Sequence, residues 1–268
     1  AMFKVLKNEK SAFLFDDEKE DVRILAWTTT PWTLPSNVAL AVGTDIEYVK
    51  IKTTNFYSKQ EVSVILAADL LEKTFAWNNL EVKQAHDLGT GKLLEGITYE
   101  PLLPYAKGAA CRVITGDFVT TSDGTGVVHI SPSHGADDKR VADLNGIEGI
   151  LLVDRQGKFT EEVFDFAGEY IKEAYLTDEE KIEEAAKQGR DTYLSVDIRI
   201  VDKLKKENKL FKSEKYEHTY PHCWRTDKPV IYYPLDSWFI KTTAVKDRLI
   251  ALNKTINWKP VTTGENRF

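Results

Sequence analysis

Short runs of β-branched and apolar residues dominate the first half of the chain and predict a region rich in strands. Each run has the length of an ordinary strand and is bounded by polar or turn-forming residues. The runs lie at residues 12–15, 22–27, 47–52, 62–66, 112–114 and 127–130. They indicate a barrel-like or mixed sheet, which we expect to carry the functional site.

Helical periodicity is weaker in this half. Apolar residues recur at helical spacing over 67–77, and a short helix is expected over 136–144, after His134 and Gly135. These helices are interspersed among the predicted strands, so the pattern favours a mixed α/β fold with helices around a sheet.

The second half changes character. Residues 178–187 are strongly charged and follow the N-cap candidate Thr177, and 195–208 form another amphipathic segment. Residues 216–243 are rich in aromatic residues and prolines, and we expect extended strands there, followed by a terminal helix over 244–252. The pattern predicts one domain over 1–268, with a core over about 10–176, a helical insertion over about 177–212 and returning strands and a connecting segment over about 213–268.

Composition is that of a globular protein, with 268 residues and 42% apolar content. No apolar run approaches the roughly 20 residues that a membrane span needs, and no secretory signal pattern opens the chain, so we expect a cytoplasmic, monomeric protein. Cys111 and Cys223 are the two cysteines and give no disulfide framework. A net charge of -6 argues against a broad basic face for duplex nucleic acid, but leaves room for a local RNA site. The only methionine, Met2, stands behind Ala1, and we expect the sequence to be an excised part of a longer protein.

The stretch TTTPWTLPSN, residues 28–37, is an unusual way to leave a strand. An ordinary turn uses Gly, Asn or Asp, whereas Thr28, Thr29 and Thr30 gather hydroxyl groups at one point. Threonine also favours strands, and proline blocks further pairing, so a simple strand end is the commoner meaning of such a pattern. The stretch is therefore a candidate site only if other residues support it.

A second unusual stretch is GTGVVHISPSHGADD, residues 124–138. His129 is the polar residue in a strand otherwise made of valine and isoleucine, so its side chain is expected to face whatever lies beside the sheet. A helix should follow Gly135, with Asp137 and Asp138 in its first turn, where the helix dipole stabilises a carboxylate. Such a carboxylate could receive an ammonium group. A hydrogen-bonded packing histidine and a pair of capping aspartates are the commoner meanings of these features.

Other catalytic templates fit poorly. Ser131 and Ser133 lie near His134, but the GxSxG elbow of serine hydrolases is absent. Glycines at 89–91 and 124–126 resemble parts of phosphate loops, yet GxxxxGK[ST] occurs at neither place. His218, His222 and Cys223 could supply metal ligands, but a closed zinc site needs four, and Thr226 cannot serve as a thiolate.

Taken together, TTTPWTLPSN and GTGVVHISPSHGADD resemble the editing domain of isoleucyl-tRNA synthetases, the connective insertion in the catalytic domain of these class I aminoacyl-tRNA synthetases. Supporting stretches run along most of the chain: LLEGITYEPLLPY, HTYPHCWRTDKPVIYYPLDSWF and NWKPVTTGENRF. The sister valyl and leucyl enzymes are similar but carry TTRP where this chain has TTTP, which favours the isoleucyl family.

The resemblance implies a set of site residues. Thr28, Thr29 and Thr30 would line the pocket for the terminal adenosine and the misattached amino acid, with Trp32 as a wall and Asn37 as a polar contact. The family's histidine corresponds to His129, and the aspartate nine residues later corresponds to Asp138, with Asp137 as its neighbour.

The implied reaction is hydrolysis of mischarged Val-tRNA(Ile). Isoleucine and valine differ by one methylene, worth only about 1 to 3 kcal/mol in a pocket, and this enzyme family is the standard illustration of that limit. Asp138 would pair with the substrate ammonium group, and the threonines would hold water and sugar. His129 would bound the side-chain pocket and contact the ribose or the water, in a steric or a proton-transfer role.

The resemblance also bears on cofactors and partners. Editing needs no cofactor and, we expect, no metal, because relatives with CWRC bind a structural zinc whereas this chain has Thr226 in place of the second thiol. ATP and Mg belong to the synthetic site, whose HIGH and KMSKS signatures are absent here. The expected partners are the 3′ end of tRNA(Ile) carrying valine and the remainder of the synthetase. A free-standing aminoacyl-tRNA deacylase and a non-catalytic module that binds the tRNA end are the alternatives.

Overall fold

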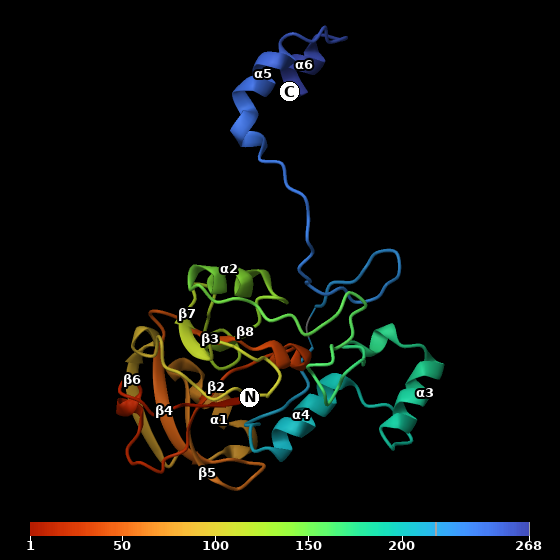
Figure 1. Cartoon of the computed structure of the whole chain (residues 1–268). Coiled ribbons are helices and arrows are strands. Elements are labelled where there is room, and N and C mark those ends of the chain that lie inside the picture. The colour runs from red at the N-terminus through yellow and green to blue at the C-terminus, as the bar shows by residue number, and fades with distance from the viewer. Residues whose placement is uncertain (218, 268) are drawn as a thin grey trace. The chain divides into compact units, whose positions relative to one another are not determined.

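The computed structural model describes residues 1–217 and 219–267, and the chain divides into two compact units, Ala1–Tyr233 and Pro234–Phe268. All named strands lie in the first unit (Figure 1). The larger sheet has the order β1-β2-β5-β4-β6 and consists of β1 (Met2–Lys4), β2 (Val22–Leu25), β4 (Glu47–Thr54), β5 (Glu61–Ala67) and β6 (Gln84–Thr90). The smaller sheet has the order β7-β3-β8 and consists of β3 (Ala39–Val42), β7 (Arg112–Thr115) and β8 (Val127–Ile130).

Both sheets are mixed. β2 pairs with β5 in parallel and with β1 antiparallel, while β3 pairs with β7 in parallel and with β8 antiparallel. An isolated bridge between Trp27 and Val128 joins the end of β2 to β8. The predicted mixed α/β class is therefore confirmed, and over the described residues the strands form two open sheets rather than a closed barrel.

One predicted strand is wrong and one observed strand was not predicted, each for a local reason. Residues 12–15 were expected to form a strand but include a 3-10 helix, η1 (Ala12–Leu14). The preceding turn explains it, because Asn8 Oδ1 accepts from the backbone N–H of Lys10 and Ser11, which bends the chain before a strand can begin. The pattern also missed β3, since its ALAV sequence is buried throughout and shows no alternation.

The helices are α1 (Leu71–Phe75), α2 (Ala136–Leu144), α3 (Asp178–Lys187), α4 (Val196–Lys206), α5 (Lys246–Asn253) and α6 (Thr262–Arg267). The predicted cap of α3 is confirmed: Glu180 N donates to Thr177 Oγ1 at 3.2 Å, and Thr177 N donates to Glu180 Oε2 at 2.7 Å. The helix predicted over 67–77 is wrong in extent, because 3-10 helices η3 (Ala68–Leu70) and η4 (Trp77–Asn79) flank a short α1.

The strands predicted over 216–243 are also wrong. Among the described residues of this stretch there is one isolated bridge, between His222 and Pro229, and no named strand. Prolines interrupt the stretch and cannot donate to a ladder, which explains why extended backbone does not become a sheet. The terminal helix was predicted more accurately: η7 (Thr242–Val245) leads directly into α5.

The main core of the first unit is shared by both sheets and α4. Leu40 of β3, Val127 of β8 and Ile65 of β5 belong to the same buried cluster as Ile200 and Leu204 of α4. A second cluster packs α2, through Val141 and Ala142, on the other face of the smaller sheet. The smaller sheet is thus covered on both faces, and β8 runs through the interior.

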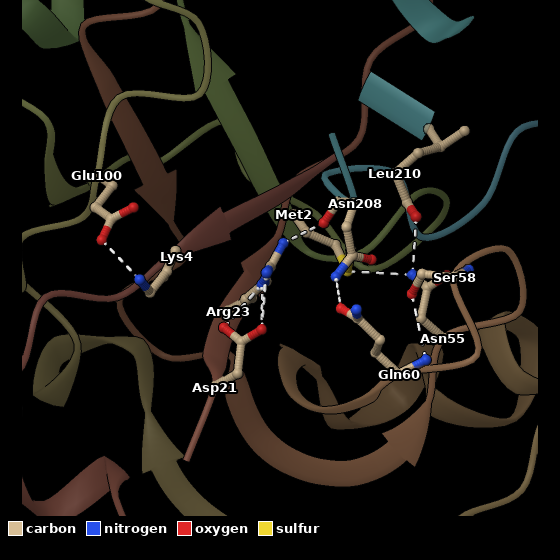
Figure 2. Close-up of polar contacts among 10 residues, drawn as sticks. All are labelled: Met2, Lys4, Asp21, Arg23, Asn55, Ser58, Gln60, Glu100, Asn208 and Leu210. Carbon is tan, nitrogen blue, oxygen red and sulfur yellow. Dashed lines mark hydrogen bonds and ion pairs between the residues drawn. The ribbon is translucent and has the colours of Figure 1, made fainter. Parts of the chain in front are cut away.

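The segment after α4 is fastened to the larger sheet, as Figure 2 shows. Asn55 Nδ2 donates to the carbonyl of Leu210 at 2.9 Å, and Met2 N donates to the carbonyl of Lys209 at 2.8 Å. Arg23, which is also paired with Asp21, donates to the carbonyl of Asn208. These bonds hold the end of α4 against strands from the beginning of the chain.

None of the helices in the described ranges is both long and apolar enough to cross a membrane.

Candidate functional site

The Thr-rich turn is a short 3-10 helix, η2 (Pro31–Ser36), that follows β2. Thr30 is its N-cap, and Pro31 occupies the first helical position, where no backbone N–H is required. The turn is closed by hydroxyl groups: Thr30 N donates to Thr28 Oγ1 at 3.1 Å, and Thr33 Oγ1 donates to the carbonyl of Thr30 at 2.8 Å. Threonine hydroxyls therefore do here what Asn or Asp side chains do in ordinary turns.

The hydroxyl groups continue as a series toward the interior. Oγ1 of Thr30 lies 3.4 Å from Oγ1 of Thr28 on one side and 3.4 Å from Oγ1 of Thr33 on the other. Oγ1 of Thr33 lies 2.8 Å from Nε2 of His129, which is buried on β8 opposite Leu40 of β3. The series begins at partly exposed threonines and ends at a buried imidazole.

The hydrogen bonds of Asn37 determine the tautomer of His129. Asn37 Nδ2 donates to the carbonyl of Ala39 at 2.9 Å, and Asn37 Oδ1 accepts from Tyr99 OH at 2.8 Å, so the orientation of the amide is fixed. Nδ1 of His129 lies 3.3 Å from this amide nitrogen and must accept, which leaves the proton on Nε2 to be donated to Thr33. Burial lowers the pKa of His129 to about 3. The imidazole is therefore neutral, and both of its nitrogens are engaged.

A cavity of about 570 Å³ lies on one side of the turn. Thr28, Thr29 and Leu34 contribute to its wall, together with Asp197 and Val201 of α4. A volume of this size is in the range of small-molecule sites, and the wall combines hydroxyl, carboxylate and apolar groups.

The rim of the cavity carries a charged and aromatic cluster. Lys73 Nζ lies 2.8 Å from Asp123 Oδ1, and Tyr216 OH donates to Asp123 Oδ2 at 2.7 Å. These two hydrogen bonds hold the pKa of Asp123 at about 2. The ring of Tyr216 packs edge-on against Trp27, with the centroids 5.2 Å apart. This part of the cavity lining thus combines an aromatic face with an ion pair between Asp123 and Lys73.

On the other side of the turn, Trp32 is buried and contacts the ring of His134 edge-on, at 4.9 Å between centroids. His134 N donates to the carbonyl of Ser131, and Ser131 N donates to Asp138 Oδ2 at 2.7 Å. Asp138 lies in the first turn of α2, as predicted, and burial raises its pKa to about 6. Asp137 is exposed and lies 3.7 Å from Arg140, so the two aspartates occupy different environments.

Two glycines of the second motif are required for different reasons. A Cβ at Gly135 would lie 2.9 Å from the carboxyl carbon of Asp138, so a larger residue there would displace that carboxylate. Gly126 has φ of +70°, and a Cβ there would lie 2.3 Å from the Cβ of Ala67. The first glycine shapes the site, and the second lets β8 approach β5.

The predicted site residues therefore fall into three positions around one turn. Of these residues, Thr28 and Thr29 line the cavity; the described lining includes neither Thr30 nor Trp32, Asn37, His129 or Asp138. Thr30 and His129 belong to the hydroxyl series, and Asn37 contacts the other nitrogen of His129. Trp32 and Asp138 lie on the side of α2.

Sequence reasoning missed three residues of the arrangement. Thr33 stands inside the same Thr-rich motif, so its hydroxyl could have been included. Tyr99 and Asp197 carry no local signal, because each meets the turn only through the fold.

The other chemical candidates do not assemble in the described part of the chain. Nδ1 of His134 lies 3.4 Å from the carbonyl of Tyr232, and its Nε2 and the hydroxyl of Ser131 are buried without a hydrogen-bond partner, so no Ser–His pair forms there. No group of three His, Cys, Asp or Glu side chains is placed to hold a metal within 1–217 and 219–267. His218, one of the predicted metal candidates, lies outside the described residues.

Comparison with known proteins gives a consistent family of relatives. An isoleucine–tRNA ligase from Cytophaga hutchinsonii is 57% identical over 293 residues, which cover 100% of this chain and 26% of the relative. The isoleucine–tRNA ligase of Porphyromonas gingivalis is 43% identical and covers 92% of this chain, and that of Rickettsia prowazekii is 38% identical and covers 97%. The chain thus spans about a quarter of the length of these relatives.

Among solved structures, the crystal structure of GlLeuRS-CP1 matches 80% of this chain and 98% of its own, with a TM-score of 0.52 and 15% identity, which shows a shared fold. No family model matches the chain.

Proposed function

The chain belongs to the isoleucine–tRNA ligase family, and on this premise we propose that it is the editing part of the ligase, which hydrolyses mischarged Val-tRNA(Ile). The partners are then the valine-bearing 3′ end of tRNA(Ile) and the remainder of the ligase chain, in the cytoplasm. No cofactor is required for this step, and ATP and Mg act at the synthetic site elsewhere in the ligase.

One observation carries the proposal: the hydroxyl series that joins a cavity to a buried, neutral histidine. Thr28 and Thr29 line the cavity. The hydroxyl series leads from Thr28 through Thr30 and Thr33 to His129 and holds the turn from the interior of the protein. A site that holds a ribose, an ester carbonyl and a water needs several neutral hydrogen-bonding groups in fixed positions. The Thr-rich turn supplies them without a charged group.

The reaction breaks the ester bond between the aminoacyl carbon and the ribose oxygen. Water adds its hydroxyl to the acyl carbon, and its proton goes to the ribose oxygen that leaves. An aminoacyl ester is already activated, so orienting the water and polarising the carbonyl are sufficient, and no covalent nucleophile is needed. A ribose hydroxyl of the substrate can assist the attack of the water.

The residues then divide the work. Thr28 and Thr29 hold sugar and water at the cavity wall, and the aromatic rim formed by Trp27 and Tyr216 suits the flat face of the terminal adenine. His129 acts through Thr33, because both of its nitrogens are engaged and its low pKa keeps it uncharged. This favours a positioning role over proton transfer.

Asp138 is proposed as the partner of the substrate ammonium group. Its carboxylate lies in the first turn of α2, and Oδ2 accepts from the backbone N–H of Ser131, which leaves acceptor capacity for a cation. Its raised pKa of about 6 still lets it ionise at neutral pH. Trp32, which packs against His134, would form the wall on the amino-acid side, and Asn37 supports His129.

Single-turnover hydrolysis of Val-tRNA(Ile) and Ile-tRNA(Ile) by this chain tests the proposal. We expect Val-tRNA(Ile) to be hydrolysed at least about 10-fold faster, because a rigid pocket wall would exclude the extra methylene of isoleucine, whereas an open apolar pocket would favour the larger side chain by roughly 1 to 3 kcal/mol. The Thr29→Ala variant and a reaction without protein serve as controls. Binding of tRNA(Ile) without hydrolysis would identify a non-catalytic module instead, and equal rates on both esters would identify an unselective deacylase.

A further inference from the structure

We propose that Asp197, in the first turn of α4, is a positioning residue that holds the Thr-rich turn in its working geometry. The proposal deepens the function proposed above and depends on it only for the kinetic part of its test. Asp197 is separated by 165 residues from the group it holds, so no local pattern points to it.

The contact is a hydrogen bond from the backbone N–H of Trp32 to Asp197 Oδ1, at 2.8 Å. Trp32 is the second residue of η2, and its N–H is the first that the helix presents, because Pro31 has none. The N-cap residue Thr30 gives no side-chain cap. An unpaired N–H at a buried helix start is costly, and a carboxylate at this end is also favoured by the peptide dipoles. Asp197 thus provides from another helix the cap that the turn lacks.

Asp197 stands on a rigid support. Val196, Ile200 and Leu204 bury one face of α4 in the main core, and Ser195 caps its beginning. The bonds drawn in Figure 2 fasten the segment after the helix to β2 and the loop at 55–60. Met2 N of β1 also donates to the carbonyl of Lys209. Because α4 is held at both ends, the carboxylate of Asp197 has a fixed position. The hydrogen bond from Trp32 therefore fixes the turn relative to α4.

The neighbours of Trp32 also hold its indole ring in place. Lys172 Nζ lies 5.5 Å from the Trp32 ring centroid and 4.6 Å from that of Tyr220, and it attracts the carboxylate of Asp197. His134 packs against the same indole. Asp197 therefore links the backbone of Trp32 to the cavity wall, where it lies with Thr28 and Thr29.

The first test measures the turn itself. Hydrogen exchange of a peptide that covers residues 28–37, or of the Trp32 amide by NMR, is compared in the wild type, Asp197→Ala and Asp197→Asn. The amide oxygen of asparagine can still accept the bond, so Asn should exchange like the wild type. Ala should exchange about 10-fold faster, because it removes the acceptor of the Trp32 N–H. Unchanged exchange in Ala, or equal acceleration in Ala and Asn, overturns the proposal.

The second test measures hydrolysis of Val-tRNA(Ile). We expect Asp197→Ala to lower kcat about 10-fold with KM within about twofold, and Asp197→Asn to restore kcat, because positioning acts on the reacting geometry more than on binding. Asp178→Ala removes an exposed carboxylate from the first turn of α3 and is the matched control, with wild-type exchange and rates. Thermal melting by circular dichroism verifies that each variant is folded.

Exchange that changes without any change in kcat overturns the positioning role. If the wild type itself hydrolyses no ester, the proposed function fails while the exchange comparison still decides whether Asp197 holds the turn.

Discussion

His129 and Asp138 flank the same turn, and burial acts on them with opposite consequences. His129 lies inside β8, is only 6% exposed, and has a pKa lowered to about 3, so it stays neutral. Asp138 lies at the start of α2, is partly exposed, and has a pKa raised to about 6, so it ionises near neutral pH. Desolvation disfavours the charged form in both cases, but only the carboxylate remains chargeable under ordinary conditions.

His129 therefore serves to position neighbouring groups, whereas Asp138 supplies a negative charge. Both nitrogens of His129 are used to hold Thr33 and to accept from Asn37, whereas Asp138 has one oxygen on a backbone N–H. A partner with a positive charge is therefore expected at Asp138, on the side of α2. On the side of the cavity, Thr28 and Thr29 present neutral hydroxyls. Each of the following predictions tests this division.

The largest effect is expected from Asp138→Ala. Loss of a charge-assisted contact to the substrate ammonium costs about 1.5 to 3 kcal/mol, so hydrolysis of Val-tRNA(Ile) should fall by about 10- to 150-fold. Asp137→Ala is the matched control, because Asp137 is exposed and contacts only Arg140 among the pairs found, and it should change the rate by less than about twofold. If Asp137→Ala abolished hydrolysis and Asp138→Ala did not, the contact to the substrate ammonium group would belong to Asp137 instead of Asp138.

The next effect concerns stability and pH. Because the pKa of Asp138 is raised from 3.8 to about 6 in the folded state, the folded protein binds this proton more tightly than the unfolded chain. Stability is therefore highest below about pH 4 for this group and is lost as the pH rises through 6. Asp138→Asn removes the titration and should gain about 3 kcal/mol relative to the wild type at pH 7.5, and much less at pH 4. Urea unfolding of the wild type and the variant at pH 4 and pH 7.5 measures this gain. A difference in stability that is the same at both pH values would show that desolvation of the Asp138 carboxylate does not cause it.

A smaller effect is expected from Gly135→Ala. Its Cβ would stand 2.9 Å from the carboxyl carbon of Asp138 and displace that group, while φ of -150° suits alanine without strain. KM for Val-tRNA(Ile) should rise about fivefold to tenfold, equivalent to about 1 to 1.4 kcal/mol, with little change in melting temperature. In the Asp138→Ala background the same substitution should add no further loss. Additive losses would show that Gly135 acts independently of Asp138.

The smallest effect, essentially none, is expected from pH on His129. Its ring signals in an NMR titration should not move between pH 5 and 8, and its nitrogen shifts should report the tautomer with the proton on Nε2. Free imidazole in the same buffer provides the reference. A titration midpoint near pH 6 to 7 for His129 would show that its imidazole can accept and release a proton near neutral pH.

Several elements could be predicted because their determinants are local. The Thr177 capping box specifies the start of α3, and the apolar spacing of 195–208 specifies α4. The position of Asp138 in a first helical turn followed from Pro132 and Gly135 before it. The 3-10 helix at 31–36 could not be predicted in this way, because the Trp32 N–H at its start has its acceptor on α4. The strands expected over 216–243 failed because strand propensity creates no sheet without a partner to pair with.

Local patterns were sufficient to predict most of the short strands of β-branched and apolar residues, the capped start of α3, the two motifs and the family that they resemble. The tertiary structure alone decided which polar atoms meet: Thr33 with His129 across 96 residues, Asn37 with Tyr99 across 62, and Trp32 with Asp197 across 165. Spacing along a chain fixes only the neighbours within a helix turn or a strand. Contacts between distant residues depend on the order of strands in each sheet and on how α4 buries its apolar face, which the fold settles as a whole.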